Sequence, residues 1–355
     1  MCTYIQLSDN RKKIISQFAI SDRDKHTYRT VEDAVKDALR RAFKDINFRT
    51  LHQQGNLYPK NLDSGQTITD VLINKLEDEG FIQEFITYFK NHNYPNEDSF
   101  DKWHNKACEN FLTVLKGYYT DSQYGKSQKI VNMMFKHLYC MNFGHNEAGD
   151  GSDWLVLDEE YFKHCHLTLD SFTLEWFHRE VVDNWHDALG NIYGKQITKG
   201  KTDSWSNLCF KNVGATRKKR MEEYKSNSDM RCGGDKGEFY HYMFFVDTIR
   251  EFFPSSNPQP QHMDESKFTD EQKEHKDRTP FQAEFYIWPN IQLHLTAEAL
   301  FGQSIGQEEA IKELESITNQ QFKDFASAQK HYRTLNRKQK LEILKKKIEY
   351  IEKIL

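Results

Sequence analysis

The sequence contains little cysteine and little proline. Six cysteines and seven prolines occur in 355 residues, and no two cysteines have the spacing CxxC. So few thiols argue against a disulfide framework and favour a reducing compartment, so we expect a cytoplasmic protein. No run approaches the roughly 18 apolar residues of a membrane-spanning helix, and the first residues lack a basic segment followed by an apolar stretch. Both absences disfavour membrane insertion and secretion.

The chain also has no excess of positive charge. Its 49 Lys and Arg are outnumbered by 53 Asp and Glu, which leaves a net charge of −4 and no global field that attracts nucleic acid or membranes. A glycine-rich run at 232–237 lacks the spacing of a phosphate-binding Walker loop, so we expect a turn there. Aromatic residues are abundant instead, at 14%, against a mean hydropathy of −0.83. This combination indicates a folded domain and not a disordered chain.

Apolar residues recur at helical spacing through most of the chain, which predicts a mainly α-helical fold with a few short strands. We expect Thr30 and Thr67 to cap helices, Gly80 to separate two helices, and Ser99 or Asp101 to begin another. The expected helices cover 30–46, 67–80, 81–91, 99–117, 126–141 and 158–164. Short extended segments or buried turns are expected at 154–157, 285–288 and 291–295, and a loop at 142–153.

Two lobes, a linker and a C-terminal segment describe the expected organisation. The N-terminal helical lobe covers 1–120 and the central lobe 121–253. Four of the seven prolines fall between Pro254 and Pro280, which predicts a surface loop or linker there. The C-terminal segment 281–355 ends in apolar residues at a 3,4 spacing, which is typical of a helix that packs on its own domain or forms a dimer seam. The oligomeric state stays open.

Two lysines lie at one border of the apolar stripe of the helix expected at 126–141. Lys129, Lys136 and Cys140 share this border on a helical wheel, so both ammonium groups are expected at the edge of whatever packs against the helix. One interpretation is an ordinary core helix whose lysines have buried stems and solvated heads. The other is an amine in a partly dry cleft that acts as a nucleophile.

A single acid, Asp170, lies in an apolar stretch about 30 residues after that helix. Its neighbours include Leu169 and Phe172, a setting in which an acid is either a helix cap or a catalytic group. The capping interpretation fits well, because Asp170 or Ser171 can begin a helix that continues through Val181.

These residues together resemble the active-site region of a known family. The spacing Gly125-x-x-Gln128-Lys129, with Lys136 seven residues later and an apolar turn that ends in Asp170, is similar to that of the helix-hairpin-helix superfamily of DNA glycosylases, nearest to the archaeal 8-oxoguanine type. The resemblance implies a two-lobed, mainly helical, glycosylase-like fold. It also implies Lys129 as the nucleophile that attacks the sugar, Asp170 as the assisting carboxylate, and Lys136 as the lesser candidate for the amine.

The resemblance covers residues 122–176 and implies an enzyme that excises a damaged or modified base from DNA, in repair or in defence against phage with modified genomes. No cofactor and no metal are expected. Attack by water with Asp170 is the alternative to a lysine mechanism. A non-catalytic component of a phage-host conflict system that binds nucleic acid or protein is the alternative to an enzyme. The catalytic interpretation predicts that Lys129 and Asp170 approach one another across a concave pocket.

A glycosylase must take its target base out of the stack and hold it in a pocket, where aromatic side chains suit the base. The alternative for each of these aromatic residues is an ordinary place in the core. The candidate pocket walls are Trp103, Trp154, Phe172, Trp176 and Trp288.

A local basic segment is the expected contact with DNA. Residues 195–220 contain eight Lys and Arg against one acid, Asp203, which gives a local charge of +7 inside an acidic protein. The alternative interpretation of this basic segment is a solvated loop. The candidate DNA-binding residues are Gly125, Lys126, Arg217, Lys218, Lys219 and Arg220.

Two further sets of residues have possible chemistry. Glu284 lies among aromatic residues, as a buried acid or on the solvent face of a strand. Thiols and imidazoles suffice in number for zinc, but adjacent His-Cys-His is not a chelating spacing. The residues of this zinc hypothesis are His104, Cys108, Cys140, His145, His164, Cys165 and His166.

Overall fold

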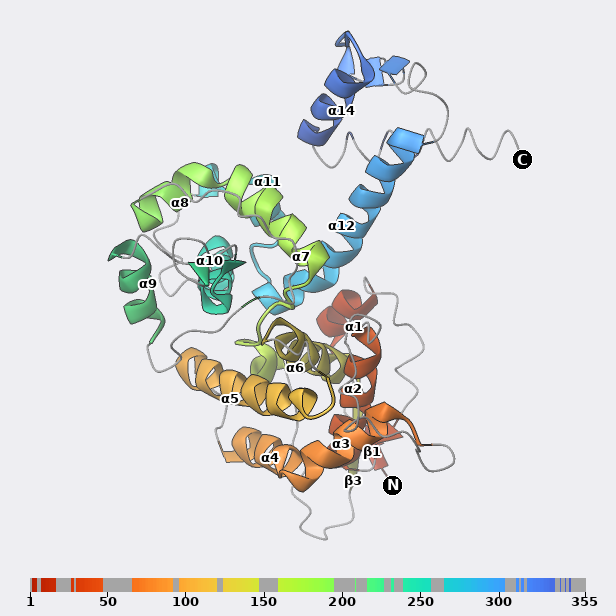
Figure 1. The fold of residues 1–355 in the computed structure, drawn as a ribbon, viewed down its shortest axis with the longest axis vertical. Coiled ribbons are helices and arrows are strands. Elements are labelled where there is room, and N and C mark those ends of the chain that lie inside the picture. The colour runs from red at the N-terminus through yellow and green to blue at the C-terminus, as the bar shows by residue number, and fades with distance from the viewer. Residues whose placement is uncertain are drawn as a thin grey trace, which may run out of the picture. The chain divides into compact units, whose positions relative to one another are not determined.

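The structure is a computed structural model, and the expected mainly α-helical fold is confirmed by it (Figure 1). The described residues form two compact units, Met1–Tyr286 and Ile287–Leu355. No described helix is both long and apolar enough to cross a membrane. The residues that the structure describes are 2–4, 8–16, 27–28, 30–46, 66–91, 96–119, 124–146, 159–194, 208, 216–226, 231–232, 239–256, 265–303, 311–312, 314–315, 318–335, 339, 342 and 345.

Helices make up most of the described chain, and α6 is central to the first unit: it packs against α2 and α5, while α2 also contacts α3 and α4 (Figure 1). The α-helices are α1 (Asp9–Ser16), α2 (Val31–Asp45), α3 (Ile68–Asp78), α4 (Phe81–Asn91), α5 (Glu97–Lys116), α6 (Tyr124–Tyr139), α7 (Ser171–Trp176), α8 (His186–Tyr193), α9 (Arg217–Ser226), α10 (Tyr242–Phe252), α11 (Asp270–Glu274), α12 (Pro280–Gln303) and α14 (Phe325–Thr334). Helix α7 continues into a π-helix, Phe177–Asp183, and 3-10 turns occur at Glu159–Phe162, Pro254–Ser256 and Glu265–Lys267.

The N-terminal helices begin and end close to the predicted positions. The Thr30 side chain caps α2, and Thr67 forms a capping box with Asp70 at the start of α3. Gly80 separates α3 from α4 with a φ of 76°, a left-handed conformation that a residue with a Cβ rarely adopts. Helix α5 begins a few residues earlier than expected, because the cap is Asn96, whose side chain accepts from the Ser99 amide.

Helix α6 is buried on all sides and not on one stripe. Every residue from Tyr124 to Tyr139 is buried except Lys129. Its polar residues are therefore interior groups that need partners inside the protein. This burial corrects the interpretation of α6 as a helix with one apolar face, and it leaves Lys129 as the residue of α6 that solvent still reaches.

A continuous helix, α12, replaces the short strands expected at 285–288 and 291–295. Thr279 and Gln282 cap its start reciprocally, and Pro280 occupies its first position, where the missing N–H costs nothing. Pro289 lies inside the helix. The strand prediction was wrong because α12 is buried on several sides in its first turns, so its apolar residues show no simple helical stripe.

Short strands occur where a loop was expected. Strand β3 (Asn142–Asn146) lies in the expected loop 142–153 and pairs antiparallel with β1 (Cys2–Tyr4) and parallel with β2 (Thr27–Tyr28). The backbone pairing with two distant segments makes this strand, and residues 142–146 have no apolar alternation that reveals it.

The expected glycine turn and the expected linker 254–280 lie farther along the chain. Strands β4 (Arg231–Cys232) and β5 (Phe239–Tyr240) form an antiparallel pair, and the glycines of the expected turn between them lie outside the described residues. The expected linker 254–280 contains two 3-10 turns and helix α11, because Thr269 and Gln272 form a capping box there. Residues 154–157 lie outside the described residues, and so does most of the predicted C-terminal repeat.

Candidate functional site

The side chains of Lys129 and Asp170 meet, although 41 residues separate them in the chain. Lys129 Nζ on α6 lies 3.3 Å from Asp170 Oδ2 at the start of α7. The Lys129 side chain is 14% exposed and that of Asp170 is 8% exposed. The predicted approach of these two residues is thus present, at a place that solvent reaches only in part.

Asp170 is also the N-cap of α7, so the capping interpretation is confirmed. Its Oδ1 accepts hydrogen bonds from the Phe172 amide at 3.0 Å and the Thr173 amide at 3.2 Å, and Thr173 Oγ1 accepts from the Asp170 amide at 2.7 Å. The two carboxylate oxygens have different partners: Oδ1 satisfies the helix, and Oδ2 faces Lys129. A cap and an ammonium-binding carboxylate therefore coexist in one side chain.

The second lysine of α6 is not available as an amine nucleophile. Lys136 Nζ lies 2.8 Å from Glu284 Oε1 on α12, and both side chains are only 1% exposed. The ammonium also lies 5.1 Å from the centre of the Phe285 ring. Glu284 is therefore a buried acid and not a residue on a solvent face. The prediction of Lys136 as a lesser catalytic candidate is corrected, because no substrate reaches an ion pair enclosed in this way.

Two of the four described aromatic candidates for a base pocket belong to the core. Trp103 packs among phenylalanines, with Phe85 and Phe135 at 5.6 and 5.7 Å between ring centres. Trp176 is 1% exposed, stacks on Phe253 and donates its indole N–H to Glu271. The pocket prediction is thus wrong for Trp103 and Trp176, because both side chains are buried against other aromatic rings.

The remaining pocket candidates differ in exposure and in their place in the chain. Phe172, two residues from Asp170, is partly exposed. Trp288 is also partly exposed, on the portion of α12 that belongs to the second unit. Trp154 lies outside the described residues. Phe172 is therefore the described aromatic side chain that stays a candidate beside the Lys129–Asp170 pair.

The two arginines of the predicted DNA-binding run point into the protein. Arg217 pairs with Glu97 at 3.1 Å and Glu251 at 2.6 Å. Arg220 pairs with Asp247 at 2.7 Å and Asp101 at 2.6 Å, and is 3% exposed. The prediction that these arginines bind phosphate is corrected, because both guanidinium groups are already paired with carboxylates, those of Arg217 partly exposed and those of Arg220 fully buried.

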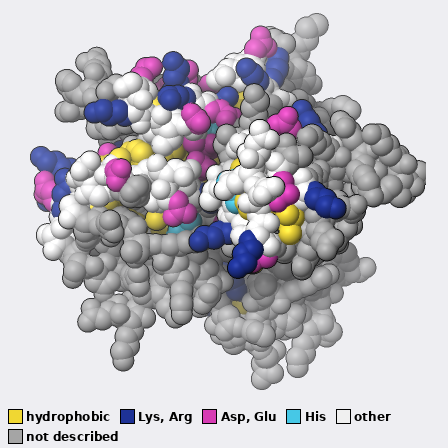
Figure 2. All heavy atoms as spheres, turned by 90° about the horizontal axis from the view of Figure 1, so that it is seen from above, with side chains coloured by type: hydrophobic (Ala, Val, Ile, Leu, Met, Phe, Trp, Pro, Cys, Tyr) yellow, Lys and Arg dark blue, Asp and Glu magenta, His cyan; other side chains and the backbone are white. Residues whose placement is uncertain are grey.

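The other DNA-binding candidates divide into exposed and buried residues. Lys218 and Lys219 are exposed on α9, whereas Gly125 and Lys126 are buried in the first turn of α6. The prediction is corrected for Gly125 and Lys126 by this burial. Basic and acidic side chains of the described residues are interspersed on the face drawn in Figure 2, which favours no single basic patch there. Of residues 195–215, the structure describes only 208.

A buried polar network surrounds Asp101 behind these arginines. Asp101 accepts from both terminal nitrogens of Arg250, from Arg220 and from His166. Burial opposes ionisation of Asp101, but Arg250 and His166 outweigh it and hold the pKa of Asp101 well below its usual range. Burial lowers the pKa of His166 to about 4. Burial also lowers the pKa of His104 well below its usual range, and the neighbouring His166 adds to this shift. The network therefore combines neutral imidazoles with an ionised Asp101 carboxylate.

No family model, curated protein or solved structure matches the chain.

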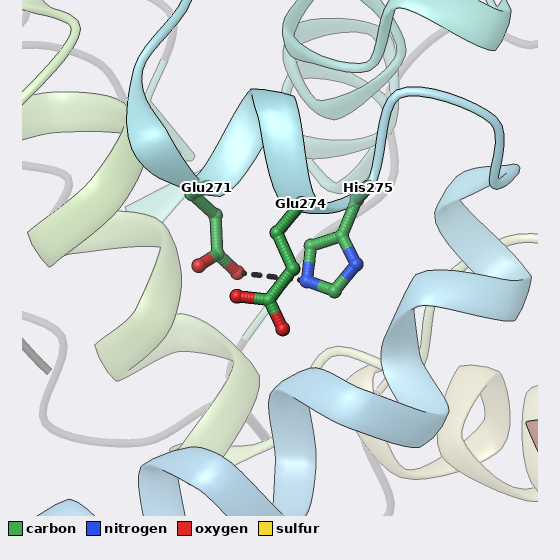
Figure 3. Close-up of side chains that lie close together, drawn as sticks. All are labelled: Glu271, Glu274 and His275. Carbon is green, nitrogen blue, oxygen red and sulfur yellow. Dashed lines mark ion pairs between the residues drawn. The ribbon is translucent and has the colours of Figure 1, made fainter. Parts of the chain in front are cut away.

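A possible metal-binding group lies on and beside α11 and does not involve the residues of the zinc hypothesis. Ligand atoms of Glu271, Glu274 and His275 all lie within 4.8 Å of one another, and Figure 3 shows the His275 ring facing Glu271. Arg278 Nη1 lies 2.6 Å from His275 Nδ1, and a guanidinium can only donate. Nδ1 is therefore the acceptor, so the proton of the neutral ring is on Nε2, 3.2 Å from Glu271 Oε1. This proton occupies the position that a metal ion needs.

A small pocket lies elsewhere in the first unit. Its lining includes Glu97, His164, Cys165 and Arg250, but neither Lys129 nor Asp170. The concave pocket expected between Lys129 and Asp170 therefore stays a prediction.

Gln128 was missed as a functional candidate in the site region, and Glu284 was considered only as a possible buried acid. The side chains of Gln128 and Glu284 hold the backbone of residues 168–169, immediately before Asp170. Gln128 was noticed only as part of the glycosylase-like spacing. A buried Gln next to the candidate lysine was the available signal, because a buried amide must satisfy both its donor and its acceptor.

Proposed function

We propose that this protein is a DNA glycosylase-like enzyme that excises a damaged or modified base, with Lys129 as the nucleophile and Asp170 as the assisting carboxylate. The observation that carries the proposal is the 3.3 Å contact between Lys129 Nζ and Asp170 Oδ2. Lys129 is also the one residue of α6 that keeps partial exposure. An amine that is reachable and oriented by an acid is what sugar attack requires.

The two residues have complementary tasks in this reaction. As Nζ bonds to C1′ of the sugar, the bond from C1′ to the base breaks and its electron pair leaves with the base. The departing base takes one proton from the Lys129 ammonium, so charge and atoms balance. Asp170 stabilises the positive charge that develops on the sugar. It then accepts a second proton from Nζ and passes it to the ring oxygen O4′, and the sugar opens to an imine on Lys129.

The position of Asp170 at the start of α7 supports this division of labour. The capping amides hold Oδ1, which fixes the carboxylate without using Oδ2. Partial burial strengthens the attraction between Oδ2 and a developing positive charge, because little water screens it. A base flipped out of the helix would be needed to bring C1′ to this pair, and Phe172 is the nearby aromatic candidate to contact it.

The proposal is tested by incubating the protein with duplex and single-stranded DNA that contains different modified bases, with and without borohydride. We expect base release from at least one substrate and a covalent DNA adduct when borohydride reduces the imine. The adduct should disappear in Lys129→Ala. Lys106→Ala is the matched control, because Lys106 is an exposed lysine paired with Glu84 on the surface.

Asp170→Asn separates the charge of Asp170 from its capping role, because asparagine also caps helices. We expect this variant to fold normally and to lose most base release. Base release without any adduct, lost only in Asp170→Asn, would replace the lysine mechanism by water attack. Tight DNA binding with no release from any substrate would overturn the enzyme proposal and favour a non-catalytic binding component.

A further inference from the structure

We propose that Gln128 and Glu284 are positioning residues that clamp residues 168–169 and so hold Asp170 against Lys129. This inference deepens the proposed function and rests on it for its catalytic meaning. The clamp itself is a feature of α6, α12 and the turn before α7, and it can be tested without DNA.

The turn before Asp170 is buried but belongs to no helix or strand. Thr168 is 1% exposed and Leu169 is 0% exposed. Backbone N–H and C=O groups in such a segment need partners, since each unsatisfied group costs free energy. Side chains supply all of them from the Thr168 amide to the Asp170 amide.

Gln128 binds the middle of this turn with both ends of its amide. Its Nε2 donates to the Leu169 carbonyl at 2.7 Å and to the Gly125 carbonyl at 2.9 Å. Its Oε1 accepts from the Leu169 amide at 3.4 Å and from Asn132 Nδ2 at 2.9 Å. Gln128 is adjacent to Lys129 in the chain, so the residue that holds the turn and the residue that faces Asp170 share one helical turn of α6.

Glu284 binds the beginning of the turn from another helix. Its Oε2 accepts from the Thr168 amide at 2.9 Å, while its Oε1 is paired with Lys136. Thr173 completes the set, because its hydroxyl donates to the Thr168 carbonyl at 2.6 Å and accepts from the Asp170 amide. Two helices and the first turn of α7 therefore fix the backbone that carries Asp170.

The consequence for the site is geometric. The contact between Lys129 and Asp170 is 3.3 Å long, so a shift of the turn by about 1 Å removes it. One part of the clamp, Glu284, belongs to a fully buried ion pair with Lys136. Burying such an ion pair costs more free energy than burying an apolar pair. The Glu284 carboxylate supplies in return an acceptor at the Thr168 amide that an apolar side chain lacks.

The first test measures how fast formaldehyde and cyanoborohydride methylate Lys129 in the protein without DNA, by peptide mass spectrometry. Asp170→Asn should raise this rate about threefold, since a weak ion pair no longer holds the amine. Gln128→Met should raise it by a similar factor. The double variant Gln128→Met/Asp170→Asn should react no faster than Asp170→Asn, because Gln128 acts through Asp170.

Thr248→Val is the matched control for Gln128→Met. It removes a buried hydrogen bond of 2.7 Å to Tyr193 in α8, away from the turn, and should leave the labelling of Lys129 unchanged. A rate in Gln128→Met that equals the wild-type rate, or a double variant whose effects multiply, would overturn the clamp and leave Gln128 a purely structural residue.

A second pair of variants tests Glu284 independently and covers the case in which Gln128→Met does not fold. Lys136→Met/Glu284→Gln and Lys136→Met/Glu284→Leu both remove the ion pair, but only the first keeps an oxygen that can accept from the Thr168 amide. We expect wild-type labelling of Lys129 in the Gln version and faster labelling in the Leu version, with less protection of the 168–170 amides against hydrogen exchange. Equal labelling in the two versions would overturn the role of Glu284.

A measurement of base release tests whether the clamp contributes to catalysis. With a substrate found as described above, Gln128→Met should lower the single-turnover rate at saturating DNA by about 10- to 100-fold, while the Kd for DNA stays within about twofold of wild type. When Asp170 is already replaced by Asn, adding Gln128→Met should not lower the single-turnover rate further. If no substrate reacts, the proposed function fails, but the labelling results still decide whether the clamp exists.

Discussion

Two lysines lie seven residues apart on the same helix, α6, and differ in their exposure to solvent. Each lies close to one carboxylate, Lys129 at 3.3 Å from Asp170 and Lys136 at 2.8 Å from Glu284. The side chains of Lys129 and Asp170 are 14% and 8% exposed, whereas those of Lys136 and Glu284 are each only 1% exposed. A lysine paired with a carboxylate is thus partly exposed at one position of α6 and enclosed at the other.

The difference between the two pairs lies in what covers them. Helix α12 places Glu284 and Phe285 over Lys136, so this lysine stabilises the interior and cannot meet a substrate. The cap of α7 supplies the acid at Lys129, and solvent still reaches this lysine in part. Burial and not residue type therefore separates a structural ion pair from a candidate catalytic pair.

Breaking the enclosed pair should have the largest effect on stability. Lys136→Met leaves the Glu284 carboxylate buried without its cation, so we expect the free energy of unfolding to fall by about 3–5 kcal/mol. Lys136→Met/Glu284→Gln should recover most of this loss, because it buries no charge. Urea denaturation followed by circular dichroism measures both changes. A loss below about 1 kcal/mol in Lys136→Met would show that the pair is not enclosed.

Acid should weaken the buried network around His166. The folded protein keeps His166 neutral with a pKa of about 4, whereas the unfolded chain binds the proton near 6.5, so the unfolded state holds more protons between these values. The free energy of unfolding should therefore fall as the pH falls through this window, by about 2 kcal/mol at pH 5 from His166. Denaturation curves at pH 7 and pH 5 test this, and His166→Gln should show a smaller pH dependence. Equal dependence in both proteins would contradict the assignment to His166.

Removing the cap should have a moderate effect on stability and a large one on activity. Asp170→Ala loses the acceptor for the Phe172 and Thr173 amides, so we expect a loss of about 1 kcal/mol in the free energy of unfolding. Asp170→Asn should lose less than half of that, since it keeps an acceptor. Both variants should lose base release. If Asp170→Asn is as unstable as Asp170→Ala, the charge of Asp170 and not its cap stabilises α7.

Removing the reachable lysine should have the smallest effect on stability. Lys129→Met deletes a partly exposed ion pair, so we expect a change below about 1 kcal/mol, within the range of surface pairs. The same substitution should abolish the borohydride-trapped adduct. Thermal unfolding and adduct formation measured on the same samples separate the two effects. A large loss of stability in Lys129→Met would remove the distinction between the two lysines.

Local signals predicted much of the helical structure. Thr30, Thr67 and Asp170 are caps, and Gly80 is a break, because each of these depends on a few neighbouring backbone groups and not on distant partners. Strand β3 was missed because its partners are the distant strands β1 and β2. Helix α12 was missed because burial on several sides hides the helical period.

The candidate site divides in the same way. The sequence by itself predicted a helix that begins at Asp170 or Ser171, because a cap depends on neighbouring residues, and the family resemblance of its motif singled out Lys129, Lys136 and Asp170 as candidates. Only the tertiary structure decided that Asp170 also faces Lys129, that Glu284 encloses Lys136, and that Arg217 and Arg220 turn inward. These outcomes depend on which helix covers which side chain, and that is set by packing between segments far apart in the chain.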